Sequence, residues 1–133
     1  MTHTEACDFV RELLPTWQER LRLRDWNITL EFVDAEVLHR DEKEEFFAWT
    51  TSDPKRMEAI IELATRRPRK ALEDVLVHEL VHVLLSEMAA EAKAGINGLG
   101  QIAAAWHDGC LKTTEERAVL RIVEGLVGRK RIR

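Results

Sequence analysis

Two histidines and a glutamate stand close together near the middle of the chain, as His78-Glu79-Leu80-Val81-His82. On an α-helix, residues four apart lie on the same face, one turn above the other. His78 and His82 can therefore both reach a single zinc ion, which binds imidazole nitrogen at about 2.0–2.1 Å. Glu79 lies roughly 100° around the helix from His78, so it can hold a water as a general base instead of binding the metal. The spacing predicts a zinc-dependent hydrolytic site.

The alternative interpretation of this motif is a polar group within an apolar core, with the histidines bonded to carbonyl groups. The motif lies in the most apolar stretch of the chain, from Val75 to Leu85. Polar side chains buried there each need a partner, because an unpaired polar group costs a few kcal/mol. One zinc ion would satisfy all three side chains, which favours the metal site.

A catalytic zinc ion takes three protein ligands and keeps one position for water, so a third ligand must come from elsewhere. Downstream candidates are His107, Asp108, Glu115 and Glu116. We favour Glu116, with Glu115 as the alternate, because both lie within roughly 60° of the inner face of the last predicted helix. Two other interpretations stay open. Glu116 could complete a capping box with Thr113, and Glu115 could be a surface charge favoured by the helix dipole.

The elements that must position these residues are two helices in the second half of the chain. Apolar residues wrap much of the cylinder from about Ala71 to Ala94, which predicts a central, buried helix. Glycines at 95, 98 and 100 mark a break. Residues 99–106 are expected to form a short helix, and Thr113 to Val127 a closing amphipathic helix.

The first half of the chain predicts one helix and about three strands. Residues 4–23 have helical periodicity, and Pro15 should kink or split that helix. Alternating residues at 26–33 indicate a half-buried strand. Residues 34–45 are expected to form a loop or a short helix. Phe46 to Thr51 and Met57 to Leu63 should form antiparallel strands around a turn at Ser52–Lys55. We therefore expect one α+β domain over residues 1–133, with a small antiparallel sheet.

Charge and composition narrow the function further. The net charge is −4 and the two cysteines are far apart, so we expect no disulfide and a cytoplasmic location. No signal peptide or membrane-spanning stretch is apparent. Basic residues cluster at 66–70 and 129–133, and are interpreted mainly as solvated charge; nucleic-acid binding through them is a minor alternative. The sequence specifies neither a substrate nor an oligomeric state.

The motif, followed by Glu116-Arg117-Ala118-Val119, resembles the gluzincin-type zinc metallopeptidases, especially minimal forms such as phage metallopeptidases and the ImmA/IrrE-like group. The compact order of elements also resembles, more distantly, the SprT-like proteins, whose third ligand is a histidine. The resemblance covers residues 26–127 in outline, and only the five-residue motif is specific. It implies a zincin-like fold and a peptide or protein substrate. It also implies that Met57 to Leu63 is an edge strand to which the substrate adds.

Two departures from the gluzincin pattern concern groups around the metal. Larger gluzincins carry an aspartate four residues after the ligand glutamate, where this chain has Leu120, or Val119 if Glu115 is the ligand. Asp74 is a candidate to replace it by orienting a zinc-bound histidine. The chain contains no tyrosine, so the tyrosine that often stabilises the oxyanion is missing. His107 is a candidate substitute.

Three functions follow from these observations. The first is zinc-dependent peptide-bond hydrolysis, with a zinc-activated water deprotonated by Glu79. The second is a non-catalytic zinc-binding regulatory or interaction module on the same scaffold. The third is a SprT-like, DNA-associated protease, which would need a histidine as third ligand and would bind DNA through the arginine clusters.

Overall fold

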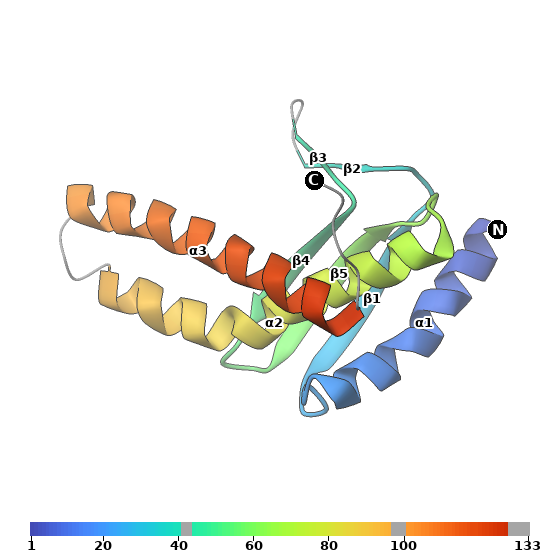
Figure 1. Cartoon of the computed structure of the whole chain (residues 1–133), viewed down its shortest axis with the longest axis horizontal. Coiled ribbons are helices and arrows are strands. Elements are labelled where there is room, and N and C mark those ends of the chain that lie inside the picture. Colours follow the sequence, from blue (N-terminus) through green and yellow to red (C-terminus); the bar gives the residue numbers. More distant parts are fainter. Residues whose placement is uncertain (41–43, 97–100, 128–133) are drawn as a thin grey trace.

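The computed structural model describes residues 1–40, 44–96 and 101–127 (Figure 1). The fold is α+β, as predicted, with an N-terminal helix, a small sheet, a central helix and a C-terminal helix. In chain order the elements are α1 (His3–Arg20), β1 (Asn27–Val33), β2 (Leu38–His39), β3 (Glu45–Phe46), β4 (Ala48–Asp53), β5 (Glu58–Ala64), α2 (Arg69–Ile96) and α3 (Gln101–Val127).

Three of the strands form one sheet in the order β1-β5-β4. The predicted hairpin is confirmed, since β4 and β5 pair antiparallel with Ala48 opposite Leu63. Its turn is fixed by the Lys55 amide, which donates to Asp53 Oδ1 at 3.2 Å, and by Met57, whose φ is 54°. However, β1 pairs parallel to β5. The sheet is therefore mixed, not purely antiparallel as expected.

The strand order also corrects the expected edge strand. Met57 to Leu63 was expected at the edge, but β5 lies in the centre, between β1 and β4. Within the described residues, β4 is at one edge of this sheet. It is also the edge strand that contacts the central helix α2. The sequence pattern is uninformative here: Ala59 and Ile61 are buried and Ile60 is exposed, an alternation that edge and central strands share. Pairing with the distant β1 decides the position.

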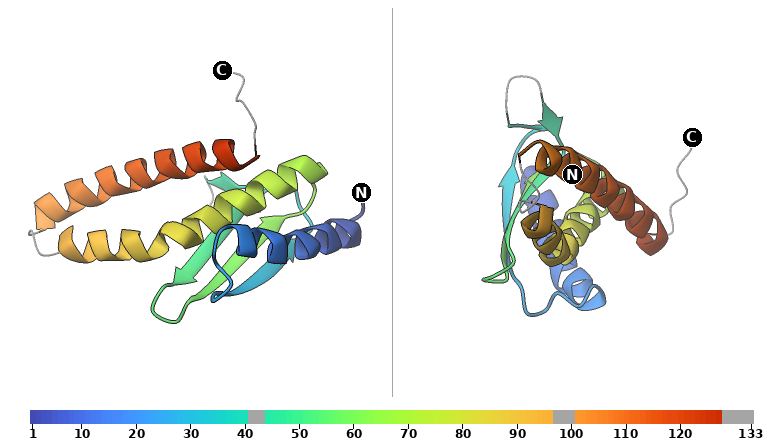
Figure 2. Two further views of the ribbon diagram at one scale, coloured as in Figure 1. Left: turned by 60° about the horizontal axis from the view of Figure 1, so that its bottom comes forward. Right: turned by 90° about the vertical axis from the view of Figure 1, so that its left-hand side faces the viewer.

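All three helices cover the same face of this sheet, as the right-hand view of Figure 2 shows. Helix α2 lies between the sheet and α3 and contacts both. Its Leu72, Leu76 and Leu80 are fully buried and pack in one core with Ile61 and Leu63 of β5. Each such side chain contributes about 1.5–3 kcal/mol when removed from water. This packing fixes the rotation of α2, and hence the direction of its histidines.

Helix α1 is continuous through Pro15, so of the two predicted effects of this proline, a kink or a split, the split does not occur. It begins at the N-cap residue Thr2, whose hydroxyl accepts from the Glu5 amide at 3.1 Å. A proline inside a helix removes a backbone donor. Here Val10 and Trp17, both buried, anchor the helix on either side of it. Trp17 Nε1 also donates to Glu73 Oε2 of α2 at 3.1 Å.

Helix α3 is longer than expected. It runs unbroken from Gln101 to Val127, so the predicted short helix and the predicted closing helix are one element. Thr113 is therefore inside the helix and is not its N-cap, which removes the capping-box interpretation of Glu116. Residues 34–45 also differ from prediction, because β2 and β3 pair antiparallel there, with Leu38 opposite Phe46.

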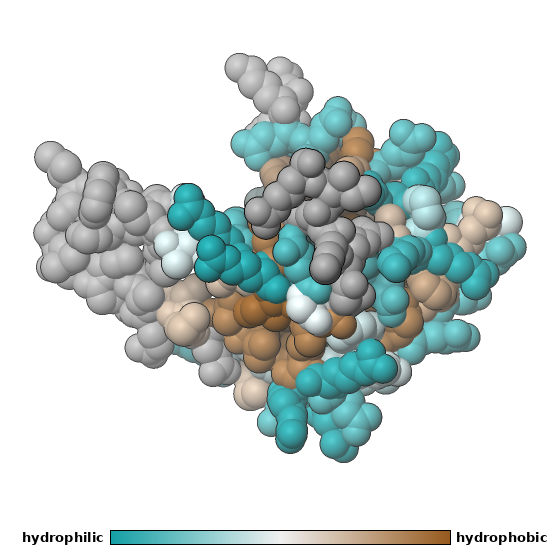
Figure 3. All heavy atoms as spheres, viewed as in Figure 1, coloured by the Kyte–Doolittle hydropathy of each residue, from teal (hydrophilic) through white to brown (hydrophobic). Residues whose placement is uncertain are grey.

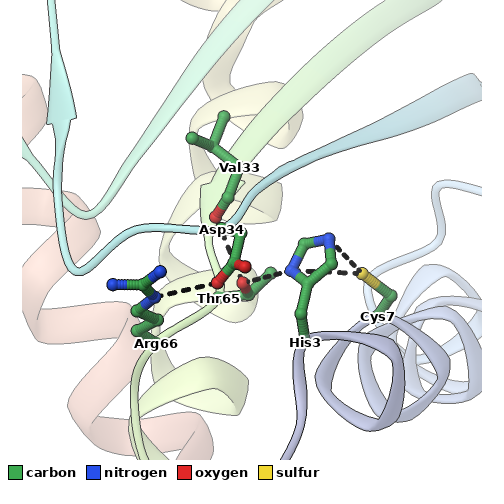
Figure 4. A network of polar contacts seen from close by, with 6 residues as sticks. All are labelled: His3, Cys7, Val33, Asp34, Thr65 and Arg66. Atoms are coloured by element: carbon green, nitrogen blue, oxygen red, sulfur yellow. Dashed lines mark hydrogen bonds and ion pairs between the residues drawn. The ribbon is translucent and has the colours of Figure 1, made fainter.

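A chain of polar contacts ties the start of α1 to the ends of β1 and β5 (Figure 4). The Thr65 hydroxyl donates to the Val33 carbonyl at 3.1 Å, so it accepts from His3 Nδ1–H at 2.7 Å. The other nitrogen of His3, Nε2, then accepts from the Cys7 thiol at 3.6 Å. Burial raises the pKa of Cys7, which keeps the thiol protonated as a donor. Nearby, Asp34 and Arg66 form an exposed ion pair at 2.8 Å.

Apolar residues gather at the middle of one face of the molecule, between hydrophilic rims (Figure 3). Large apolar side chains that are exposed among the described residues include Phe47, Ile60, Leu84 and Met88. Among the described residues, no helix is both long enough and apolar enough to cross a membrane.

Candidate metal site

The two histidines of the motif lie side by side on α2, near α3. The ring centroids of His78 and His82 are 5.0 Å apart, with the rings tilted by 60°. Their side chains are 27% and 20% exposed, so they border solvent without being buried in the core. This is the arrangement expected for residues four apart on one helical face, and it leaves room for a third ligand.

Helix α3 supplies a carboxylate at that point. Glu116 Oε1 lies 2.9 Å from His82 Nε2, and Glu116 Oε2 lies 3.8 Å from His78 Nε2. One ligand atom from each of these three residues lies within 4.8 Å of the others. For comparison, ligands at about 2.0–2.2 Å from a tetrahedral zinc are separated by roughly 3.3–3.6 Å. The observed distances bracket that separation, so the three residues form a group that could hold a metal ion.

Glu115 lies against the opposite side of the His82 ring. Its Oε1 accepts from His82 Nδ1–H at 3.1 Å, and its side chain is 23% exposed. This bond leaves Nε2 of the same ring facing the Glu116 carboxylate. A nitrogen and a carboxylate oxygen 2.9 Å apart attract one another when a cation lies between them, either a proton or a metal ion. A carboxylate behind a ligating histidine is also the usual outer partner in zinc sites.

Glu79 stands beside this group and is held by the sheet. It is only 9% exposed, and the Thr50 hydroxyl of the edge strand β4 donates to its Oε2. The pKa of Glu79 is raised, chiefly because the carboxyl group is buried. The hydrogen bond from Thr50 and the charge of His82 lower this pKa, whereas the negative charge of Glu116 raises it. A carboxyl with a raised pKa, fixed by one hydrogen bond, suits proton transfer.

The other predicted site residues are not part of the group formed by His78, His82 and Glu116. Asp74 is one turn before His78 on α2 and lines the same cavity. His107 and Asp108 belong to α3, but their side chains lie outside the described residues. Leu120, four residues after Glu116, lines the cavity next to His78.

Two cavities flank the motif, and both are lined by His78 and Glu79. The first has a volume of about 560 Å³ and includes His82, Glu116 and Thr50. The second has a volume of about 440 Å³ and extends past Ala48 to Arg67. Phe46 and Ala48 also line both, so the cavities adjoin along the edge strand β4.

Sequence reasoning missed Thr50 and Arg67 as site residues. The signal for Thr50 was present, because alternate residues of β4, namely Ala48, Thr50 and Ser52, share one face and line the cavities. Which face turns toward α2 depends on packing and is not fixed by the alternation. For Arg67, the sequence shows only one arginine in a basic cluster.

No protein-family model, no curated protein and no solved structure matches this chain.

Proposed function

We propose that this protein is a zinc-dependent peptidase. The observation that supports it most directly is the convergence of one ligand atom each from His78, His82 and Glu116. Glu79, at the same point of α2, is held near them by Thr50. Two imidazoles and a carboxylate, with a second carboxylate left to move protons, form the donor set of a hydrolytic zinc centre.

Each residue then has a distinct role. His78, His82 and Glu116 hold the zinc, and Glu115 keeps the His82 ring in the tautomer with Nε2 as ligand. Zinc, when bound, lowers the pKa of a water toward about 7 and polarises the scissile carbonyl. Glu79 takes a proton from the attacking water as the water oxygen bonds to the carbonyl carbon. Glu79 then gives that proton to the amine nitrogen as the C–N bond breaks, leaving a carboxylic acid and an amine.

The edge strand β4 offers a place for the substrate backbone. Within the described residues it pairs with β5 along one side only. Its Ala48, Thr50 and Ser52 line the larger cavity, and Ala48 also lines the smaller one. An extended peptide can add to such an edge through main-chain hydrogen bonds. This position carries the peptide past Thr50 and therefore past Glu79.

Substitution of Glu79 by glutamine tests the proposal. Glu79→Gln keeps the shape of the side chain and removes its basicity, so cleavage of a casein peptide mixture should fall at least about 100-fold. Zinc stoichiometry, measured by elemental analysis, should stay at the wild-type value because Glu79 is not a ligand. Equal cleavage by the variant and the wild type would show that the base is misassigned.

A non-catalytic zinc-binding module is the second candidate. The chain has no tyrosine to stabilise an oxyanion, and Leu120 stands where an orienting aspartate is found in larger gluzincins. This candidate predicts stoichiometric zinc with no cleavage in any peptide mixture. The DNA-associated alternative receives less support, because the third converging residue is a glutamate. In addition, Arg66 pairs with Asp34 and Arg67 stacks on Phe47.

A further inference from the structure

Arg67 has an unusual environment at the far end of the smaller cavity. Its guanidinium lies flat over the Phe47 ring, with Cζ 3.4 Å from the ring centroid. Its Nε is buried and makes no hydrogen bond to any described residue. A buried donor without an acceptor costs about 1–3 kcal/mol, and more when it is charged. Stacking on an aromatic ring stabilises the charge but leaves the in-plane N–H groups without acceptors.

The cavity connects this guanidinium with the reacting groups. The lining includes Phe46, Phe47 and Ala48 beside β4 and apolar residues of α2 and α3, together with His78 and Glu79. Arg67 is the only lysine or arginine among the described lining residues. A ligand in this cavity would therefore meet one arginine among apolar and acidic side chains.

Acidic residues line the cavity as well, so the binding of an anion needs a specific place. Glu45, Asp74 and Glu124 are among the lining residues, but none of them forms an ion pair with Arg67 within the described part of the chain. Asp74 and Glu124 have contacts of their own. Among the described lining residues, Arg67 is therefore the group suited to an anion, because a planar guanidinium can bind a carboxylate through two parallel hydrogen bonds.

We propose that Arg67 recognises a carboxylate of the substrate, on the side downstream of the scissile bond. The side follows from strand direction. Antiparallel pairs are the commoner kind, and β4 already pairs antiparallel with β5. A peptide antiparallel to β4 runs from the Asp53 end toward the Ala48 end, so the residues after the cleaved bond enter the cavity of Arg67. The carboxylate is either the C-terminus of the peptide or an Asp or Glu side chain.

This inference rests on the proposed peptidase function, and cleavage mapping tests it first. Zinc-loaded wild type, Arg67→Gln and Arg67→Lys are incubated with casein peptides, and the new ends are identified by mass spectrometry. Wild type should cleave preferentially within about two residues upstream of an acidic residue or of a C-terminus. Arg67→Gln should lose about tenfold or more in kcat/KM on those sites. Arg67→Lys, which keeps the charge but not the planar fork, should lie between them.

Arg66→Gln is the matched control. Arg66 is the adjacent arginine, is exposed and pairs with Asp34, so its loss should leave the cleavage preference unchanged. Zinc stoichiometry and the thermal midpoint show whether each variant is folded. An acidic preference that persists in a folded Arg67→Gln variant would overturn the proposal. Peptides with Asp replaced by Asn, or with an amidated C-terminus, show which carboxylate is recognised.

A binding measurement separates the failure of this inference from failure of the peptidase function. Fluorescence anisotropy measures the affinity of zinc-loaded Glu79→Gln protein for two pairs of labelled peptides. One pair differs in the C-terminus, free acid against amide, and the other differs in one residue, Asp against Asn. Suppose that wild type cleaves nothing, but the carboxylate peptide binds about tenfold tighter than its neutral counterpart and Arg67→Gln removes this difference. In that case only the peptidase function fails, and the role of Arg67 stands. Equal binding of every acidic and neutral pair would overturn the role of Arg67.

Discussion

At the metal site, two adjacent glutamates contact different nitrogens of the histidines. Glu116 lies near Nε2 of both His78 and His82, whereas Glu115 accepts from Nδ1 of His82. The sequence identified both glutamates as candidate ligands but could not assign their roles. Neighbouring helical residues differ by about 100° in direction, and the rotation of α3 against α2 decides which of them reaches the metal. In the proposed site, the glutamate pair would combine a ligand with its supporting carboxylate.

These roles predict different losses of zinc. Glu116→Ala removes a ligand and should abolish stoichiometric zinc at micromolar concentrations of protein. Glu115→Ala removes only the outer partner of His82, so affinity should fall by about 10–100-fold, as measured by competition with a chromophoric chelator. Glu124→Ala is the control on the same helix and should bind zinc like the wild type. Greater loss in Glu115→Ala than in Glu116→Ala would reverse the assignment.

At the scale of elements, the contact between β4 and α2 joins the edge of the sheet to Glu79, the proposed general base. Thr50 extends from the strand and donates to Glu79, whereas the side chain of its neighbour Thr51 is exposed. The existence of this strand could be predicted from its residue types. Its position at the edge could not, because the order of strands depends on the parallel pairing of β1 with β5 across a long stretch of sequence.

Removal of the Thr50 hydroxyl should affect turnover more than metal binding. Thr50→Val leaves Glu79 without its donor, so the carboxylate is less well oriented and kcat should fall about tenfold, corresponding to a hydrogen bond of about 1–1.5 kcal/mol. Zinc stoichiometry should not change. Thr50→Ser should restore most of the activity, and Thr51→Val should behave as wild type. If Thr50→Val and Thr51→Val have the same kcat, the contact does not position Glu79.

The packing of α2 against the sheet predicts a contrast between two leucines of that helix. Leu76 is fully buried in the core, whereas Leu84 is 39% exposed. Leu76→Ala should lower the free energy of unfolding by about 2–5 kcal/mol, because it leaves a cavity. Leu84→Ala should lower it by under about 1 kcal/mol. Urea unfolding of the zinc-free chains measures both, and equal losses would contradict the packing described for α2.

For the whole molecule, periodicity and apolar pattern predicted the fold class, because most of the elements are long enough to show it. Failures occurred where a local signal competed with long-range packing. Pro15 was expected to kink or split α1, and the split does not occur, since Val10 and Trp17 anchor the helix on both sides. Likewise, Thr113 resembles an N-cap, yet α3 continues through it from Gln101, held by its contact with α2. The prediction that His78 and His82 lie together does not depend on these features, because both residues are on the single helix α2.

The polar contacts of Thr65 predict how strongly the start of α1 is joined to the sheet. Thr65 is 3% exposed and links His3 of α1 with Val33 of β1. Thr65→Val keeps the shape but leaves His3 Nδ1–H without its acceptor, so the free energy of unfolding should fall by about 1–3 kcal/mol in urea. Thr65→Ser should lose less, because it keeps the hydroxyl. Asp34→Asn is the control: it disrupts an exposed ion pair nearby, and such pairs contribute little. If Asp34→Asn is more destabilising than Thr65→Val, the buried hydroxyl is not what joins α1 to the sheet.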